Sequence, residues 1–284
     1  MWKYLLLAAC AGLTTAAERT VDPTFLHRYV PDVREAAVEI ASSASHYRPL
    51  FGAGDAPSPI VRGVARFGEL TVDPGGSTPH VQYPAEEQAW VVLSGAGAVT
   101  YASEKVPVRA NDFFYVPAKV QHALACTSAA PCRVMIMGFK LPAGTAADTP
   151  KKLDVANIDD VKLQTVGNHP DSVQYRLMMG DTTSKRDRIA AAHVLTSLYV
   201  MEFAPGGTNF PHHHETEEEI YLVLSGRGEM VAGGGVDGVE GRHAAKAGDG
   251  YFFRLNCTVG FYAAKDAPQP ARILAVRSRF PFRK

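Results

Sequence analysis

An internal repeat is the feature that most limits what this chain can fold into. Residues 74–76 (PGG) match residues 205–207, and residues 93–95 (LSG) match residues 224–226, both at a separation of 131 residues. A later block, NDFFYVP at 111–117, matches GDGYFFR at 248–254, and the larger separation of 137 residues fits a Gly-rich insertion in the second half. Self-similarity of this kind predicts two copies of one domain.

The composition of both copies is typical of β-structure. Short apolar, β-branched and aromatic runs alternate with turn residues, and the chain holds 25 Gly and 19 Pro. The run IYLVL at 220–224 is apolar on both faces, which indicates a strand buried inside a barrel or sandwich. Outside the copies we expect one short helix over residues 32–41 and another near residues 158–163.

The stretch 206–226, GGTNFPHHHETEEEIYLVLSG, carries the residues that are best suited to chemistry. In an extended segment, residues two apart project to the same side, so His212 and His214 point together while His213 points away. Together with Glu219 they form a set of two imidazoles and one carboxylate, which suits Fe, Mn, Zn and similar divalent ions. The alternative is a solvated polar loop, but such a loop does not need the flanking glycines or the apolar strand that follows.

The spacing of Gly206, His212, His214, Glu219 and Gly226 resembles the first motif of the cupin superfamily, and the duplication makes the chain similar to a bicupin. The resemblance covers roughly residues 60–140 and 190–280. It implies an all-β fold of two tandem cupin-type β-barrels of the jelly-roll type, with short helices in the N-terminal arm and the linker. It also implies a divalent transition metal (Mn, Fe, Zn, Ni or Cu) inside the second barrel.

The second motif of the family usually brings a fourth ligand, a histidine, and here Val259 stands in its place. Arg254 stands where that motif has a proline. Arg254 is a candidate for binding a substrate carboxylate by a bidentate contact, or else a surface residue at a strand end. Tyr221 shares the inward parity of Glu219 and is a candidate catalytic phenol. Cys257 is either a substitute ligand or a core residue.

The first copy differs from the second at the ligand positions: it keeps the second-motif histidine but lacks the glutamate. By the same resemblance His80 and Gln82 hold the two histidine positions, Gln88 holds the glutamate position, and His122 keeps the second-motif histidine. Two imidazoles and two neutral amides make a weak site for a hard divalent ion, since no ligand carries charge. We therefore expect the metal in the second copy, beside a degenerate first site.

Three histidines, His169, His193 and His243, have no partner at ligand spacing, and we interpret them as structural or surface residues. Cys126 and Cys132 flank a predicted hairpin turn. They form either a disulfide, in an oxidising compartment, or two free thiols.

The chain divides into five predicted segments: a signal peptide (1–17), an N-terminal arm (18–60), the first cupin domain (61–142), a linker with connecting strands (143–190) and the second cupin domain (191–284). The start, MWKYLLLAACAGLTTAA, is typical of a secretory signal and too short to span a membrane. A lipoprotein box ending at Cys10 is the alternative, but the six apolar residues before it are few, which favours soluble export to the periplasm or exterior.

The balanced charge of the chain argues against one class of function, nucleic-acid binding. The 29 basic and 29 acidic residues cancel, and no basic stripe of the kind that binds nucleic acid is visible. The resemblance implies a metal-dependent enzyme acting on a small polar or carboxylate-bearing molecule, of dioxygenase, decarboxylase, isomerase or hydrolase type, with oxidoreductase or lyase chemistry favoured. The alternatives are an exported, non-catalytic binding or storage-type bicupin, and a structural homodimer, because fold does not fix function.

Overall fold

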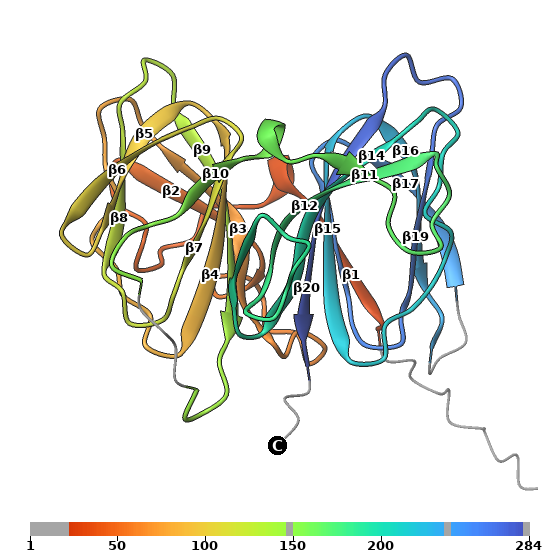
Figure 1. The fold of residues 1–284 in the computed structure, drawn as a ribbon, viewed down its shortest axis with the longest axis horizontal. Helices are drawn as coiled ribbons and strands as arrows, with labels where there is room; N and C mark the ends of the chain where they lie inside the picture. The colour runs from red at the N-terminus through yellow and green to blue at the C-terminus, as the bar shows by residue number, and fades with distance from the viewer. Residues whose placement is uncertain (1–22, 146–149, 236–239, 281–284) are drawn as a thin grey trace, which may run out of the picture.

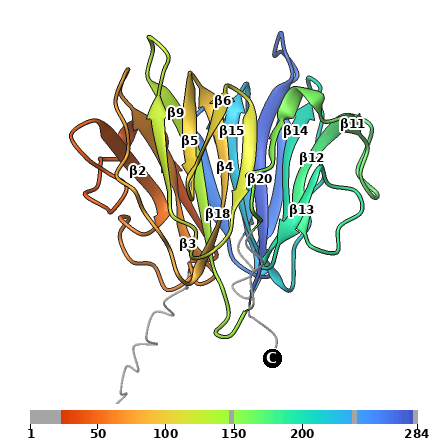
Figure 2. The ribbon, with the colours of Figure 1, turned by 60° about the vertical axis from the view of Figure 1, so that its left-hand side comes forward.

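Two β-domains lie side by side in the computed structural model, which describes residues 23–145, 150–235 and 240–280 (Figure 1). Strands form nearly all of the regular structure in these ranges, so the predicted all-β fold of two tandem barrels is confirmed. In the turned view, the strands of the two domains fan out on opposite sides of their contact (Figure 2). None of the described helices is long and apolar enough to cross a membrane. The predicted signal peptide and Cys10 lie outside the described residues.

Each domain combines a large sheet with a three-stranded one. In the first domain the large sheet has the order β10 (Val155–Asn157), β7 (Asp112–Val116), β4 (Glu86–Ser94), β9 (Cys132–Lys140), β3 (Val64–Val72) and β2 (Ser45–Gly52). Its small sheet has the order β6 (Glu104–Arg109), β5 (Ala96–Tyr101) and β8 (His122–Cys126).

The second domain repeats this plan with additional strands. Its large sheet has the order β1 (Phe25–Tyr29), β18 (Asp249–Phe253), β15 (Glu217–Ser225), β20 (Ala271–Arg279), β14 (Leu195–Phe203), β12 (Val173–Asp181) and β11 (Leu163–Gln164), with β13 (Ile189–Ala192) pairing β12. Its small sheet has the order β17 (Glu240–Lys246), β16 (Arg227–Gly233) and β19 (Thr258–Ala263).

The leading strand of each domain pairs with the other domain. Strand β1, before the first domain, runs antiparallel to β18 of the second, and β10, before the second domain, runs antiparallel to β7 of the first. Figure 1 shows β1 in red among the blue strands. Residues of the predicted arm and linker therefore supply strands to the large sheets of both domains.

The helix predicted over residues 32–41 is not formed. A single 3-10 turn spans Val30–Asp32, and the chain then continues without helix to residue 38. Ala36 N donates to Tyr47 O (2.9 Å), so this backbone is bonded to β2 instead of to its own preceding turn. Near residues 158–163 only a 3-10 turn, Ile158–Asp160, appears.

Three buried clusters form the core. One fills each barrel, and the third joins the large sheets of the two domains. Phe51 of the first domain meets Phe252 of the second in this third cluster, with ring centroids 5.8 Å apart. Strand β15, which contains the predicted buried run 220–224, lies inside the second large sheet between β18 and β20.

Candidate metal centre

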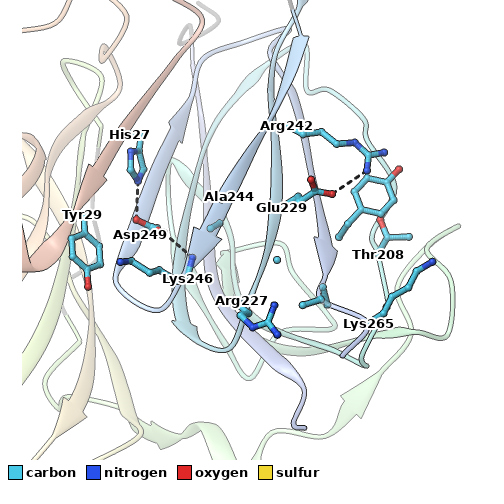
Figure 3. A pocket seen from close by; sticks show the side chains of 16 residues that line it. His27, Tyr29, Thr208, Arg227, Glu229, Arg242, Ala244, Lys246, Asp249 and Lys265 are labelled. Atoms are coloured by element: carbon cyan, nitrogen blue, oxygen red, sulfur yellow. Dashed lines mark hydrogen bonds and ion pairs between the residues drawn. The ribbon is translucent and has the colours of Figure 1, made fainter. Parts of the chain in front are cut away.

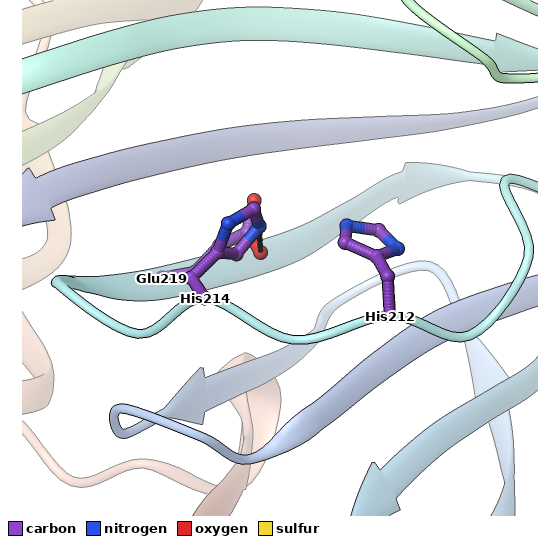
Figure 4. A group of neighbouring side chains, drawn as sticks. All are labelled: His212, His214 and Glu219. Carbon is purple, nitrogen blue, oxygen red and sulfur yellow. Dashed lines mark ion pairs between the residues drawn. The ribbon is translucent and has the colours of Figure 1, made fainter.

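The second barrel brings the three predicted ligands together. His212 and His214 lie in an extended segment that leads into β15, and Glu219 lies on that strand (Figure 4). Their donor atoms all lie within 4.8 Å of one another. The histidine segment is not part of a regular strand, but two hydrogen bonds with Val259 hold His212: His212 N donates to Val259 O (3.0 Å) and Val259 N donates to His212 O (2.8 Å). The extended backbone predicted from the spacing is therefore present.

Glu219 is a buried, ionised carboxylate. Its side chain accepts a hydrogen bond at Oε1 from Tyr199 Oη (2.6 Å), and its Oε2 lies 3.2 Å from His214 Nε2. Burial by itself would raise the pKa of Glu219, but His214, Arg277 and His212 together lower it to about 2. The carboxylate is therefore negative at neutral pH and available as an anionic ligand.

Hydrogen bonding orients the imidazole of His212. Its Nδ1 lies 2.8 Å from Phe210 O, which places the ring proton on Nδ1 and leaves the lone pair on Nε2. Burial lowers the pKa of His212 below its ordinary value, so the ring is neutral near pH 7. A neutral imidazole with a free Nε2 is the form that binds a metal.

Two of the converging atoms have no hydrogen-bond partner. His214 Nε2 and Glu219 Oε2 are buried and form an ion pair at 3.2 Å, but neither atom makes a hydrogen bond of regular geometry. An unpaired buried polar atom costs about 1–3 kcal/mol. A cation bound between them would satisfy both, so the donor set fits a divalent transition ion.

A cavity of about 90 Å³ adjoins the three ligands. Its lining is made of Val166, His169, Tyr175, Leu177, Arg186, Ser197, Tyr199, His212, His214, Tyr221 and Arg277. Arg277, on β20, pairs in register with Glu219, and its Nη1 lies 3.2 Å from Glu217 Oε2. Arg186 donates from Nη2 to Ser197 Oγ (3.3 Å). Two guanidinium groups thus line the cavity.

The two predicted catalytic residues occupy different places. Tyr221 lines the cavity, and its hydroxyl accepts a hydrogen bond from Asn209 Nδ2 (3.1 Å). Arg254 is not among the lining residues, and its backbone N donates to Thr24 O (3.1 Å). Arg277 and Arg186, instead of Arg254, are the arginines that line the cavity. Sequence reasoning missed them because neither lies in a motif.

Three of the four ligand positions of the first domain, Gln82, Gln88 and His122, make internal hydrogen bonds. Gln88 donates from Nε2 to Glu86 Oε1 (2.6 Å) and accepts from Trp90 Nε1 (2.8 Å). Arg66 donates from Nε to the same carboxylate (2.7 Å). The buried charge beside Gln88 is therefore a guanidinium already paired with a carboxylate, which disfavours a second cation there.

The other three predicted positions of the first domain do not form an open donor set with Gln88. His80 and Gln82 are exposed, and Gln82 Nε2 donates to Lys119 O (2.6 Å). His122 is buried with its Nδ1 2.9 Å from Val120 O. Burial, together with the charges of Arg66 and His80, lowers the pKa of His122 to about 4, against the hydrogen bond to Val120 O, which raises it.

A much larger hollow lies elsewhere in the second domain. It measures about 1150 Å³ and lies against the outer side of β16, β17 and β19, beside β1 (Figure 3). Several of its charged side chains are paired: Arg242 Nη1 lies 3.2 Å from Glu229 Oε2, and His27 Nε2 lies 2.9 Å from Asp249 Oδ1. None of the three metal-ligand candidates lines it, so it is separate from the metal centre.

The described cysteines, Cys126, Cys132 and Cys257, are all free and buried. Of the two alternatives for Cys126 and Cys132, the structure therefore has the free thiols. Cys257 lies in the core of the second barrel, where its Sγ is 3.4 Å from both the N and the O of Gly233.

The sequence matches a known protein family in both domains. The family model described as "Cupin domain" matches residues 68–138 and 199–277, together more than half of the chain. A search of curated proteins found no match.

Similar solved structures extend over nearly the whole chain. A putative glyoxylate-induced protein from Pseudomonas aeruginosa has a TM-score of 0.73 at 14% identity, covering 95% of this chain and 94% of that one. Protein YlbA from E. coli has a TM-score of 0.68 at 12% identity, with coverages of 94% and 97%. Lactobacillus farciminis oxalate decarboxylase, in a formate complex, has a TM-score of 0.66 at 14% identity, with coverages of 93% and 88%. At these identities the likeness shows a shared fold.

Proposed function

We propose that this chain, which belongs to the cupin family, binds one divalent transition-metal ion in its second domain and acts there on a small carboxylate-bearing molecule. One observation carries the proposal: His214 Nε2 and Glu219 Oε2 are buried without hydrogen-bond partners and converge with His212 within 4.8 Å. The ligands would be His212, His214 and Glu219, and Mn, Fe, Zn, Ni and Cu all suit this donor set. Such an ion supplies a Lewis acid with open positions for substrate.

The cavity supports a small anionic substrate. Its volume of about 90 Å³ is well below the roughly 300–1,000 Å³ of pockets for drug-sized ligands. Arg277 is positioned to orient a carboxylate, because a guanidinium binds both oxygens of such a group in one plane. Its Nε is buried without a hydrogen-bond partner and is available for this contact.

Other side chains of the barrel would maintain the reacting geometry. Tyr199 holds Glu219 through its hydroxyl, which fixes the direction of the second carboxylate oxygen. Tyr221 is held by Asn209 at the cavity wall. Burial raises the pKa of both tyrosines well above the ordinary value, so both stay protonated. Tyr199 donates its proton to Glu219, and Tyr221 keeps a hydroxyl proton that it could donate to substrate. Oxidoreductase or lyase chemistry on the bound carboxylate is the activity that we propose.

A non-catalytic binding protein is the second candidate, and one observation favours it. Val259, at the position where the second motif has a ligand, is buried in the apolar core of the barrel. In that case the second domain would hold a small anion without turnover. Export through residues 1–17 and assembly as a homodimer also remain proposals, testable by N-terminal sequencing of the mature protein and by its mass in solution.

The test begins with metal analysis of the full chain, purified without added metal and then reconstituted with each candidate ion. We expect about one equivalent per chain, falling below about a tenth in His212→Ala and Glu219→Gln. His122→Ala should keep the full equivalent, because His122 is not part of the group of three donors formed by His212, His214 and Glu219. The metal-loaded protein is then screened for turnover of small carboxylates. Absence of metal from the folded wild type would refute metal binding, and tight carboxylate binding without turnover would favour the second candidate.

A further inference from the structure

We propose that His169 supplies a fourth protein ligand to the metal centre, replacing the histidine that the second motif lacks at Val259. This inference depends on metal binding by His212, His214 and Glu219, as proposed above. His169 lies between β11 and β12, two strands of the second domain's large sheet, and lines the same cavity as the two histidines. It is about 90 residues from Val259 in the sequence.

The spacing of the imidazoles fits a shared ion. The ring centroids of His169 and His212 are 5.3 Å apart, and those of His212 and His214 are 5.1 Å apart. Two imidazoles that bind one ion at about 2.0–2.1 Å place their ring centres roughly 4.5–5.3 Å apart for ligand angles of about 90–110°. His169 therefore stands to His212 much as His214 does.

The hydrogen bonds of the two rings follow the same pattern. His169 Nδ1 lies 2.8 Å from Asn209 O, and His212 Nδ1 lies 2.8 Å from Phe210 O. Each contact places the proton on Nδ1 and leaves the lone pair on Nε2. Metal-bound histidines almost always donate their other ring N–H in this way. Two consecutive carbonyls thus orient two imidazoles.

The backbone that presents these carbonyls is in an unfavourable conformation. Phe210 has φ of 53°, in the left-handed region, and the residue is 54% exposed, so apolar burial does not compensate for the strain. Asn209 secures the turn: its Oδ1 accepts from Phe261 N (2.8 Å) and its Nδ2 donates to Tyr221 Oη (3.1 Å). The fold therefore maintains a strained turn whose carbonyls bind His169 and His212.

The position that the motif assigns to the fourth ligand is closed to a metal. Val259 pairs with His212 through both its N and O, and its side chain is packed in the barrel core. His169 lies outside the set of three whose donors are within 4.8 Å of one another, so ligation requires its ring to approach the triad. His169 lines the same cavity as His212 and His214, which gives its ring room to move.

The experiment uses the full chain with Cu²⁺ as a spectroscopic probe and Zn²⁺ for affinity. Pulsed EPR of the Cu²⁺ protein should count three imidazoles in the wild type and two in His169→Ala. Competition with a chelator should show Zn²⁺ affinity falling by about 10- to 100-fold in the variant. His213→Ala is the matched control: His213 is exposed beside the ligands, and its loss should leave three imidazoles and full affinity.

A second variant separates ligation from packing. His169→Phe keeps a ring against Tyr175, whose ring centroid is 5.5 Å away, but offers no nitrogen. The Cu²⁺ spectrum of His169→Phe should show one imidazole fewer than the wild type, and its Zn²⁺ affinity should be as low as that of His169→Ala. In the absence of metal, its melting temperature should equal that of the wild type. If both variants keep the wild-type spectrum and affinity while His212→Ala loses binding, His169 is not a ligand and the proposed function stands. If the folded wild type binds neither ion, both proposals fail.

Discussion

Glu87 and Glu218 occupy equivalent positions in the two domains, and each buried carboxylate accepts hydrogen bonds from the backbone of the other domain. Glu87 accepts from the N–H groups of His193 (2.8 Å), Val194 (2.9 Å) and Leu195 (2.8 Å). Glu218 accepts from those of Arg62 (3.0 Å), Gly63 (2.8 Å) and Val64 (3.3 Å). The carboxylate of each domain thus binds backbone N–H groups at the start of a strand in the other domain. We therefore expect the two domains to unfold together.

Replacing Glu87 by alanine should destabilise the whole chain. The change leaves three backbone N–H groups and the Tyr115 hydroxyl without their acceptor, and the free energy of unfolding should fall by at least about 3 kcal/mol. Urea unfolding, followed by a signal from each domain, measures this. Glu229→Ala is the control: both partners of its ion pair with Arg242 are half exposed, and it should change stability by less than about 0.5 kcal/mol. A loss in Glu87→Ala as small as that would contradict the role given to the carboxylate.

The two barrels carry their buried arginine on different strands. Arg66 on β3 pairs in register with Gly138 on β9, whereas at the equivalent pair in the second domain Ser197 lies on β14 and Arg277 on β20. A Cβ on Gly138 would overlap Glu86 Oε1 and lie 2.8 Å from Arg66 Cγ. The absence of a side chain at Gly138 therefore makes room for the Arg66–Glu86 ion pair.

Gly138→Ala should consequently cost about 1–3 kcal/mol of unfolding free energy, because the buried ion pair must move. Thermal and urea unfolding of the metal-free protein measure the change. Gly241→Ala serves for comparison, since its new Cβ would meet only the end of the His243 side chain at 3.2 Å. Equal stability of the two variants would show that the ion pair shifts at no cost.

Stability should depend on pH through His122. Its pKa is about 4 in the folded chain and about 6.5 when unfolded, so between these values the unfolded state binds the extra proton. The contribution of His122 to the free energy of unfolding is fully present above about pH 6.5. It decreases by up to about 3 kcal/mol as the pH falls to about 4.

His122→Phe removes this dependence and keeps a ring against Trp90. The stability of the wild type relative to the variant should fall as the pH is lowered from 7 to 4, measured by urea unfolding at several pH values. Burial raises the pKa of Glu218 to about 7, which works in the opposite direction, but both proteins contain Glu218 and the difference between them isolates His122. A difference that stays constant with pH would contradict the prediction.

Arg277→Lys should weaken carboxylate binding without removing the metal. Lysine keeps the charge but loses the planar pair of donors, so the affinity of the metal-loaded protein for formate should fall by about tenfold. Calorimetry measures the affinity, and metal analysis checks that the ion is retained. Arg254→Lys tests the hypothesis made from the sequence: Arg254 does not line the cavity, and its variant should bind formate normally. The reverse result would place substrate recognition at Arg254.

The sequence by itself determined the duplication, the β-class and the set of His212, His214 and Glu219. These ligands lie within eight residues of one another, and the geometry of an extended backbone fixes which of them project together. The parity of Tyr221 placed it at the cavity for the same reason.

Only the tertiary structure decided what surrounds the ligands. Arg277 lies opposite Glu219 because of the register between β15 and β20, and His169 lines the cavity because it lies in the connection between β11 and β12 of the same sheet. Strand register and chain crossing depend on the packing of whole sheets, and a local pattern does not encode them. For the same reason the sequence pattern indicated Arg254, which lies in the second motif, although Arg277 is the arginine that lines the cavity.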